Sequence, residues 1–268
     1  MRIYRYIRNS DVYLKYLQPL RVKLIPWYSK PIAIVKILFS SQLAILVKRN
    51  TYKGDGFLTT HYVPWHKNGK FYNSYLASFS EVPIRHKTLR DTLWRAHIVS
   101  TCANWASAVP GDFVELGTWY GILAQVLVRN GDLPNDKQMY LVDAYGSVGF
   151  QMQGEHKKYN YVEDIYETVK RRFSAYSNVV LVRGIVPEIL PDIPTKSVSF
   201  LMIDMNSGRP ERLGLEYFWE KISPGGVIYF DDYGQDFPQL RVEIEDFLKD
   251  KVENLMIFPS GQAILIKK

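Results

Sequence analysis

Three aspartates follow two short apolar runs in the second half of the chain. Asp204 ends the run VSFLMID, and Asp231 with Asp232 ends the run GVIYFDD. If both runs are parallel strands, their carboxyl ends meet at one edge of a sheet, where ligands of such sheets bind. Like charges gathered there repel unless a positive group lies between them. We therefore expect a hard divalent cation, Mg²⁺ above all, because such ions prefer oxygen ligands.

A second interpretation of these acids needs no metal. Asp231 and Asp232 would then cap the loop and form salt bridges to Arg209 or Arg212. Asn206 would supply a carbonyl oxygen to a ligand in the first interpretation and only bond the turn in the second.

A glycine-containing segment follows an earlier apolar run and opens a helical pattern. Glycines there allow a tight turn and a close approach of backbone to a ligand, and a helix N-terminus offers free N–H groups. Glu115 would repel a pyrophosphate, but its carboxylate suits the cationic amino group of an aminoacyl cofactor. We expect a cofactor to contact Glu115, Gly117, Trp119, Tyr120 and Gly121. The alternative is a close-packed turn.

Two further positions fit an adenosine. Asp143 ends the next apolar run, 26 residues after Gly117, where an acid can accept both ribose hydroxyls. Gly184 and Ile185 follow the run after that, where backbone N–H groups and an apolar side chain would hold an adenine. A turn or helix-capping aspartate and a simple turn are the respective alternatives.

The elements that would position these residues alternate from residue 111 onward. We predict strands at 112–117, 139–146, 179–184, 198–205, 226–232, 253–260 and 262–268. Helical patterns lie between the earlier runs and suggest five βα repeats, but the last two runs leave no room for a helix and must form a hairpin. We expect an α/β fold with a Rossmann-like, seven-stranded, mostly parallel sheet, an antiparallel C-terminal hairpin and helices on both faces.

Charge is unevenly distributed along the chain. Residues 1–53 hold eleven Lys or Arg against the single acid Asp11, so their net charge is about +10. The net charge of the whole chain is +7, so the remaining residues are slightly negative overall. We divide the chain into a basic, aromatic N-terminal arm and cap region, helical or irregular, at 1–88, and a catalytic domain at 89–268. This asymmetry argues against nucleic acid as a partner. Peripheral membrane contact and a homodimer stay open for the arm.

The sequence also indicates a compartment. The apolar run at 31–47 is only 17 residues long and contains Lys36 and Gln42, whereas a membrane-spanning helix needs about 20 apolar residues. The N-terminus has no signal-peptide pattern. Cys102 is the single cysteine and cannot form an internal disulfide. We expect a cytoplasmic protein, with a membrane-peripheral arm as the open alternative.

Four motifs resemble the macrocin and mycinamicin O-methyltransferase (TylF-like) family of class I S-adenosylmethionine-dependent methyltransferases. They read PGDFVELGTWYG (110–121), LVDAYGS (141–147), SFLMIDMN (199–206) and SPGGVIYFDDYG (223–234). The resemblance implies methyl transfer from S-adenosylmethionine to a hydroxyl of a sugar or sugar-like group. The acceptor would be a small molecule or a glycosylated compound. Met202 and Asn206 stand where family members often carry a histidine and a second acid.

The resemblance also implies roles for individual residues. Asp204, Asp231 and Asp232 would hold Mg²⁺, while the loop after Glu115 and the carboxylate of Asp143 would bind the cofactor. Asp204 would either assist deprotonation of the acceptor or hold the metal, and both roles stay open. A metal-free alternative uses a histidine as the base, with candidates His61, His66, His86 and His97.

Three other function classes remain as alternatives. An NAD(P)-dependent oxidoreductase is disfavoured because Thr118 and Trp119 follow Gly117, where a second glycine is expected. Phosphoryl transfer is disfavoured because the chain has no P-loop. A non-catalytic methyltransferase-fold module, whose basic arm binds a membrane or a polyanion, would leave three convergent acids without a ligand.

Overall fold

The computed structural model of the chain describes residues 52–65, 69–83, 92–146, 163–234 and 238–268. The chain divides into two compact units, one of Met1–Thr51 with Thr59–Tyr62 and one of Tyr52–Leu58 with Val63–Lys268. The second unit, called the sheet unit below, contains the seven-stranded sheet and the residues of the candidate site. The apolar run at 31–47 and the stretch around residue 88 lie outside the described residues, so the predictions made for them stay predictions.

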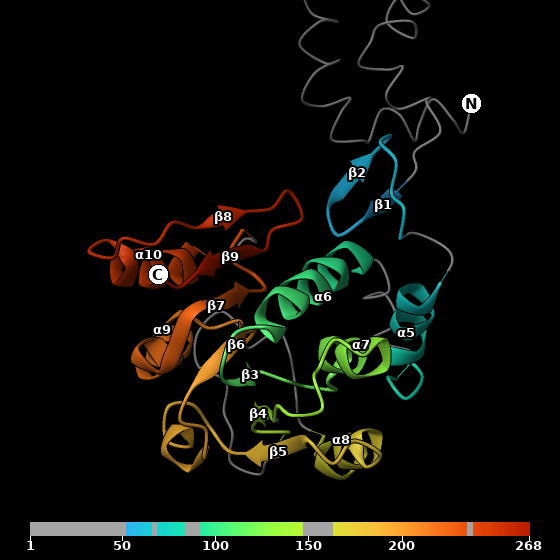
Figure 1. The fold of residues 1–268 in the computed structure, drawn as a ribbon, viewed down its shortest axis with the longest axis horizontal. Coiled ribbons are helices and arrows are strands. Elements are labelled where there is room, and N and C mark those ends of the chain that lie inside the picture. Colours follow the sequence, from blue (N-terminus) through green and yellow to red (C-terminus); the bar gives the residue numbers. More distant parts are fainter. Residues whose placement is uncertain (1–51, 66–68, 84–91, 147–162, 235–237) are drawn as a thin grey trace, which may run out of the picture. The chain divides into compact units, whose positions relative to one another are not determined.

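A seven-stranded sheet forms the centre of the sheet unit (Figure 1). Its order is β5-β4-β3-β6-β7-β9-β8, with parallel pairing from β5 to β7 and antiparallel pairing of β9 with both β7 and β8. The strands are β3 (Asp112–Leu116), β4 (Met139–Asp143), β5 (Val179–Arg183), β6 (Val198–Ile203), β7 (Ile222–Phe230), β8 (Met256–Ile257) and β9 (Ala263–Ile266). The predicted sheet and its terminal hairpin are confirmed.

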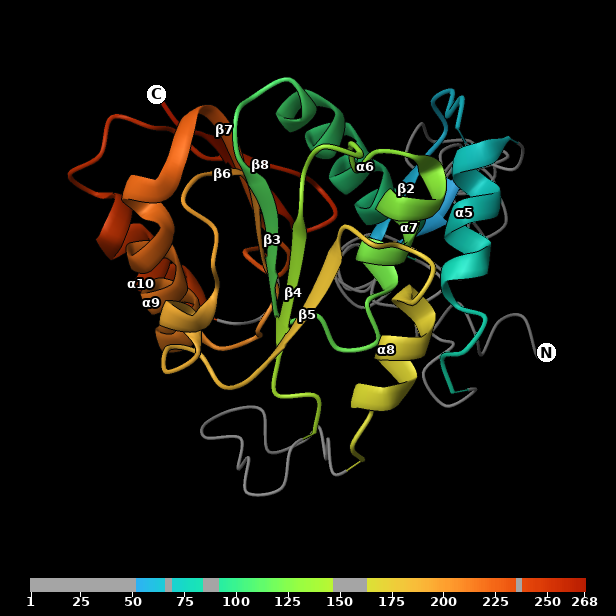
Figure 2. The same ribbon diagram turned by 60° about the horizontal axis from the view of Figure 1, so that its bottom comes forward.

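Alternate residues along each strand face opposite layers of helices, as a period of two requires. Phe113 and Met202 belong to the core on one face, whereas Val114 and Ile203 belong to the core on the other. Figure 2 shows the sheet edge-on with a helical layer on either side. Both faces are therefore buried, which explains why the central strands read as nearly continuous apolar runs.

One layer contains α5 (Lys70–Ser78), α6 (Leu93–Ser107), α7 (Ile122–Asn130) and α8 (Tyr166–Phe173), and the other contains α9 (Gly208–Phe218) and α10 (Pro238–Leu248) (Figure 2). Two 3₁₀ turns, η5 (Leu190–Asp192) and η6 (Trp219–Lys221), complete the list of helical elements in the described residues. The connection from β5 to β6 thus holds a single 3₁₀ turn, so the expected five-fold βα series is wrong at this one step. Pro191 and Pro194 interrupt that connection, and proline disfavours a helix interior.

A short hairpin precedes the sheet in the sequence and packs on α6 through aromatic rings. It consists of β1 (Tyr52–Gly54) and β2 (Phe57–Thr59). The ring centroid of Trp94, on α6, lies 5.5 Å from that of Tyr52, 4.9 Å from that of Phe57 and 5.0 Å from that of Trp65. These contacts fix the hairpin turn beside the first turn of α6.

Within the described residues, no helix combines the length and the apolar character needed to cross a membrane.

Candidate active site

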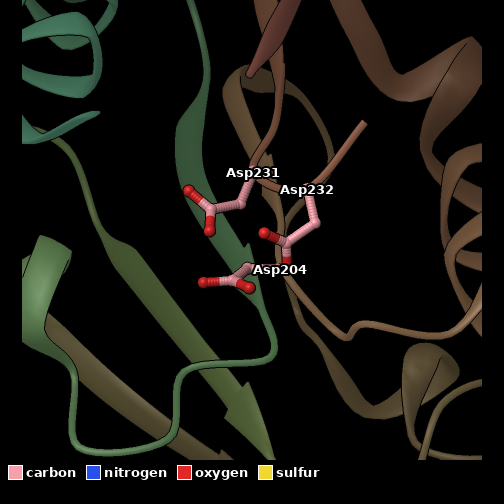
Figure 3. A group of neighbouring side chains, drawn as sticks. All are labelled: Asp204, Asp231 and Asp232. Carbon is pink, nitrogen blue, oxygen red and sulfur yellow. The ribbon is translucent and has the colours of Figure 1, made fainter. Parts of the chain in front are cut away.

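Three carboxylates from two strand ends lie together at the carboxyl edge of the sheet (Figure 3). Asp204 follows β6, and Asp231 and Asp232 follow β7, the neighbouring parallel strand. One oxygen of each carboxylate lies within 4.8 Å of the others. The structure therefore brings these three predicted site residues together.

Backbone hydrogen bonds continue past the strand ends and hold these acids in place. The N–H of Asp204 donates to the carbonyl oxygen of Leu116 at 2.8 Å, and the N–H of Asp231 donates to that of Ile203 at 3.0 Å. Asp204 and Asp231 are thus the first residues after β6 and β7, and their N–H groups form the last hydrogen bonds of this part of the sheet. The backbones of Asp204 and Asp231 are therefore held side by side at the ends of neighbouring strands.

Burial makes the ionised forms of these acids costly. Loss of water raises the pKa of Asp204 well above its usual range, and the charges of Asp231 and Asp232 raise it further. Burial likewise raises the pKa of Asp232, to about 7, with the charge of Asp231 acting in the same direction. Such a group stays ionised near neutral pH only if a cation compensates it.

An arginine that the sequence analysis did not select supplies part of this compensation. The guanidinium of Arg95, on α6, donates a short hydrogen bond from Nη1 to Asp231, and the same nitrogen lies 3.4 Å from Asp232. Burial lowers the pKa of Arg95, but the negative charges around it outweigh that effect and hold the pKa well above its usual value.

Neither predicted partner forms a described salt bridge with the trio. Arg212 instead forms salt bridges with Glu216, Glu243 and Asp246. The suggested pairing of Asp231 and Asp232 with Arg209 or Arg212 is therefore wrong. Arg212 lies on α9 and reaches its own helix and α10, whereas Arg95 reaches the trio from the opposite layer of helices.

Arg95 is also held from its far side by the β1–β2 hairpin. Its Nε donates to Oδ2 of Asp55 at 3.1 Å, and its Nη2 donates to Oδ1 of the same carboxylate at 2.9 Å. The paired geometry matches the fork of a guanidinium to both oxygens of a carboxylate. Asp55 lies in the hairpin turn with a φ of 52°. Arg95 thus links Asp55 to Asp231. No local sequence pattern predicts this link, because the three residues lie far apart in the chain.

The expected cofactor edge begins at Glu115, near the end of β3. Its side chain is 2% exposed, and Oε2 has no hydrogen-bond partner among the described residues; the same holds for Oγ1 of Thr118. Burial raises the pKa of Glu115 to about 8, the nearby hydroxyl of Thr118 opposes this, and the negative charge of Asp143 raises the pKa further. A buried carboxylate oxygen without a donor is costly, so this position favours a cationic ligand.

Asp143 ends β4 beside this loop and organises it. Its Oδ2 accepts the N–H of Trp119 at 2.7 Å, and its Oδ1 accepts the N–H of Tyr145 at 2.6 Å. Each carboxylate oxygen has a second lone pair, so both can still accept a hydroxyl. Burial raises the pKa of Asp143, while these backbone donors lower it.

Of the remaining residues predicted to bind the cofactor, some are exposed to solvent and others are buried in the core. Ile185 is 41% exposed after β5, whereas Tyr120 is buried. The N–H of Gly184 donates to the carbonyl oxygen of Asp143 at 3.0 Å, and this bond brings the ends of β4 and β5 together. Gly121 packs against the ring of Phe173, so close packing alone already accounts for this glycine.

Strained backbone conformations cluster at this edge of the sheet. Among the described residues, four that are not glycine have φ in the left-handed region: Asp55, Trp119, Tyr145 and Asn206. The last three lie two or three residues beyond the ends of β3, β4 and β6. Such conformations cost of order 1–3 kcal/mol each and often mark ligand sites.

A buried glutamate underlies the loop that carries Asp204. Oε1 of Glu211, at the start of α9, accepts the N–H of Met205 at 3.1 Å. Burial raises the pKa of Glu211 to about 8, and the backbone N–H groups of Met205, Ser207 and Asn206 oppose this. Asn206 places its Nδ2 only 3.5 Å from Oδ1 of Asp204, which is a weak contact.

The candidate base His97 belongs to the aromatic cluster instead of the acid trio. Its ring stacks on Trp65 with centroids 4.4 Å apart, and burial lowers its pKa to about 4. His66 and His86 lie outside the described residues, and His61 belongs to the other unit.

The model of the macrocin-O-methyltransferase (TylF) family matches residues 95–257, which is more than half of the chain and includes the ends of β3, β4, β6 and β7. The chain belongs to the macrocin-O-methyltransferase (TylF) family. The match begins at Arg95, the residue that bridges the acid trio and the hairpin.

Curated relatives are similar to this chain over slightly more than half of their own length. The demethyldecarbamoylnovobiocin O-methyltransferase of Streptomyces niveus is 27% identical over 141 residues, which cover 47% of this chain and 53% of the relative. The mycinamicin III 3''-O-methyltransferase of Micromonospora griseorubida is 27% identical over 143 residues, covering 47% and 56% respectively. The chain thus spans slightly more than half of each relative.

Solved methyltransferase structures share the fold. The O-methyltransferase NovP superposes with a TM-score of 0.58 at 21% identity, covering 67% of this chain and 81% of that one. A calicheamicin methyltransferase superposes with a TM-score of 0.55 at 16% identity, covering 75% and 94%. These two structures support the Rossmann-like sheet assigned here.

Proposed function

We propose that this chain transfers the methyl group of S-adenosylmethionine to a hydroxyl of a sugar or sugar-like acceptor, assisted by a divalent cation such as Mg²⁺. The observation that carries the proposal is the convergence of Asp204, Asp231 and Asp232 at the sheet edge that also holds Glu115 and Asp143. Family membership supports methyl transfer. The names of the relatives, which include methyltransferases of novobiocin and mycinamicin compounds, support a glycosylated acceptor.

The cofactor fits the groups at the ends of β3 and β4. The unpartnered Oε2 of Glu115 is suited to the amino group of S-adenosylmethionine, and the free lone pairs of Asp143 are suited to its ribose hydroxyls. Ile185 offers an exposed apolar surface for the adenine. When bound, the cofactor supplies an electrophilic methyl group on a sulfonium.

A divalent cation fits the acid trio by charge and by spacing. With all groups ionised, four acids (Asp55, Asp204, Asp231, Asp232) face one cation, Arg95, which leaves a net charge of −3. A buried excess of this size favours a divalent cation with oxygen ligands. When bound, such an ion stabilises negative charge that develops on an acceptor oxygen.

Asp204 is the acid we assign to the acceptor hydroxyl. Apart from the weak contact with Asn206, no described side chain donates to it, so its carboxylate is open to an acceptor hydroxyl. Asp204 would hold the acceptor oxygen in line with the methyl group and take its proton. Its location beside Gly117 brings this step next to the cofactor loop.

Titration calorimetry with S-adenosylmethionine, with and without Mg²⁺, tests the proposal first. We expect the unmodified chain to bind S-adenosylmethionine with a micromolar Kd, which corresponds to a binding free energy of about −8 kcal/mol. In Asp143→Asn the affinity should fall by about tenfold or more. The matched control is Asp192→Asn, an exposed aspartate on η5, which should bind normally. Transfer of radiolabelled methyl to a panel of glycosylated acceptors then identifies the substrate.

A second function class is favoured by one observation. The salt bridge of Arg95 with Asp231 reduces the cost of keeping the acids together without a ligand, so a non-catalytic interaction module is also consistent with this geometry. Absence of S-adenosylmethionine binding in the same calorimetry would contradict methyl transfer and favour that class.

A further inference from the structure

We propose that Arg95 competes with a divalent cation for Asp231 and Asp232, and thereby sets the cation affinity of the site and links cation binding to the β1–β2 hairpin. This inference rests on the proposed function, because it concerns the same acids. It assigns a role to a residue outside the trio and to the hairpin turn that anchors this residue.

Both oxygens of Asp231 are already engaged by protein donors. Oδ2 accepts Nη1 of Arg95, and Oδ1 accepts the hydroxyl of Tyr229 at 2.5 Å. Asp232 shares the guanidinium at 3.4 Å. Asp204 has no comparable donor among the described residues. A cation that enters the trio therefore meets one acid that is free and two that Arg95 partly occupies.

A guanidinium and a divalent cation repel each other when they share the same carboxylate oxygens. The repulsion is strong at the short distance that shared ligand oxygens impose, and it is twice as large for a divalent ion as for a monovalent one. The side chains of Arg95 and Asp231 are only 14% and 3% exposed, so water screens them little. Ligation of a cation by all three acids therefore requires the guanidinium to withdraw from Asp231.

The hairpin gives Arg95 a second partner when it withdraws. Asp55 holds the guanidinium by two hydrogen bonds of 2.9 and 3.1 Å, and it lies in a hairpin turn that is packed on Trp94. In the cation-free protein the guanidinium bridges the turn and the trio. With the cation bound, the bridge is broken on the side of the trio, and the turn loses its tie to β7.

Calorimetric titration of Mg²⁺ into the unmodified chain and into Arg95→Gln tests the competition. We expect the variant to bind Mg²⁺ at least about tenfold more tightly, because the competing charge is gone. The control is Arg171→Gln, which removes an exposed arginine that pairs with Glu81 and should leave the affinity unchanged. Equal affinities of the unmodified chain and Arg95→Gln would overturn the proposal.

Arg95→Lys keeps the charge but replaces the fork with a single ammonium that cannot hold both carboxylates in the same way. We expect its affinity for Mg²⁺ to lie between those of the other two proteins, and this variant decides the question if Arg95→Gln does not fold. An affinity equal to that of the unmodified chain would then overturn the competition.

Amide hydrogen exchange of residues 52–57 tests the link to the hairpin. We expect saturating Mg²⁺ to increase exchange there in the unmodified chain and to change nothing in Arg95→Gln. Unchanged exchange in a chain with bound Mg²⁺ would overturn the link. Binding of S-adenosylmethionine without any Mg²⁺ binding in either protein would overturn the competition and leave methyl transfer intact. Mg²⁺ competition without S-adenosylmethionine binding would contradict methyl transfer alone.

Discussion

Gly117 lies against the backbone carbonyl of Asp204 so closely that a methyl group on Gly117 would overlap the carbonyl oxygen. The contact joins the loop after β3, where we place the cofactor, to the loop after β6, where we place the acceptor. The two halves of the proposed reaction thus share one point of backbone contact.

Substitution of Gly117 by alanine should destabilise the fold and weaken cofactor binding together. The φ of +90° disfavours a side chain, and the new methyl group must also push the Asp204 carbonyl away, so we expect a loss of about 2 kcal/mol or more. Gly225→Ala is the control. Gly225 has a φ of +84°, but an added methyl group would meet only Val109, at 3.5 Å, and should cost about 1 kcal/mol. Denaturant unfolding of both variants measures the difference, and equal losses would contradict the expected overlap.

Cofactor binding should release a proton from Glu115. Burial raises the pKa of Glu115 to about 8, so near neutral pH its carboxyl is largely protonated, and a cationic amino group beside it favours ionisation. Affinity should therefore increase as the pH rises from about 6 toward neutrality. Calorimetry in two buffers with different ionisation enthalpies measures the release. Glu115→Gln should bind more weakly and show no dependence on the buffer, and a buffer-independent enthalpy in the unmodified chain would contradict this role.

Removal of the divalent cation should abolish methyl transfer without abolishing cofactor binding. A cation that stabilises charge on the acceptor oxygen contributes several kcal/mol, so chelation should lower the rate by about a hundredfold or more. The groups assigned to the cofactor, Glu115 and Asp143, do not belong to the trio. We expect added Mg²⁺ to restore the rate in the unmodified chain but not in Asp204→Asn. Full activity in the presence of a chelator would show that the cation is not needed.

The aromatic contacts of the hairpin should contribute strongly to stability. Trp94→Ala removes a ring that packs on Tyr52, Phe57 and Trp65, and such a substitution costs about 3 to 5 kcal/mol. Trp105→Ala provides a control on the same helix, because Trp105 is 51% exposed, and it should cost less than about 1 kcal/mol. Thermal unfolding of the two variants measures both effects. A small effect of Trp94→Ala would mean that the hairpin packs only weakly on α6.

The elements with strong periodic patterns could be predicted from the sequence. The β3 strand at Asp112–Leu116 and the β6 strand at Val198–Ile203 lie inside the predicted ranges, because continuous apolar runs identify strands buried on both faces. Each observed strand ends slightly earlier than predicted, since the backbone leaves the ladder at Gly117 and Asp204. The parallel pairing of β6 with β7 also made it possible to predict that Asp204, Asp231 and Asp232 lie close together.

The compensating charge could not be predicted in the same way. Arg95 and Asp231 are 136 residues apart, and no periodic pattern in the sequence relates a residue of α6 to the residue that follows β7. Arg209 and Arg212 are the arginines near Asp204 in the chain, but Arg212 pairs with Glu216 and Asp246. A contact fixed by tertiary packing leaves no local signal.

The packing of the hairpin and of α5 on the sheet unit has a practical consequence for shortening the protein. Tyr52, Tyr75 and Phe79 are buried in the same core as α6 and α7. A truncated version that starts at residue 89 would retain the seven-stranded sheet and all three acids, yet it would expose this apolar surface and leave Arg95 without Asp55. Such a fragment would be prone to aggregation, and its measured affinity for Mg²⁺ would differ from that of the full chain.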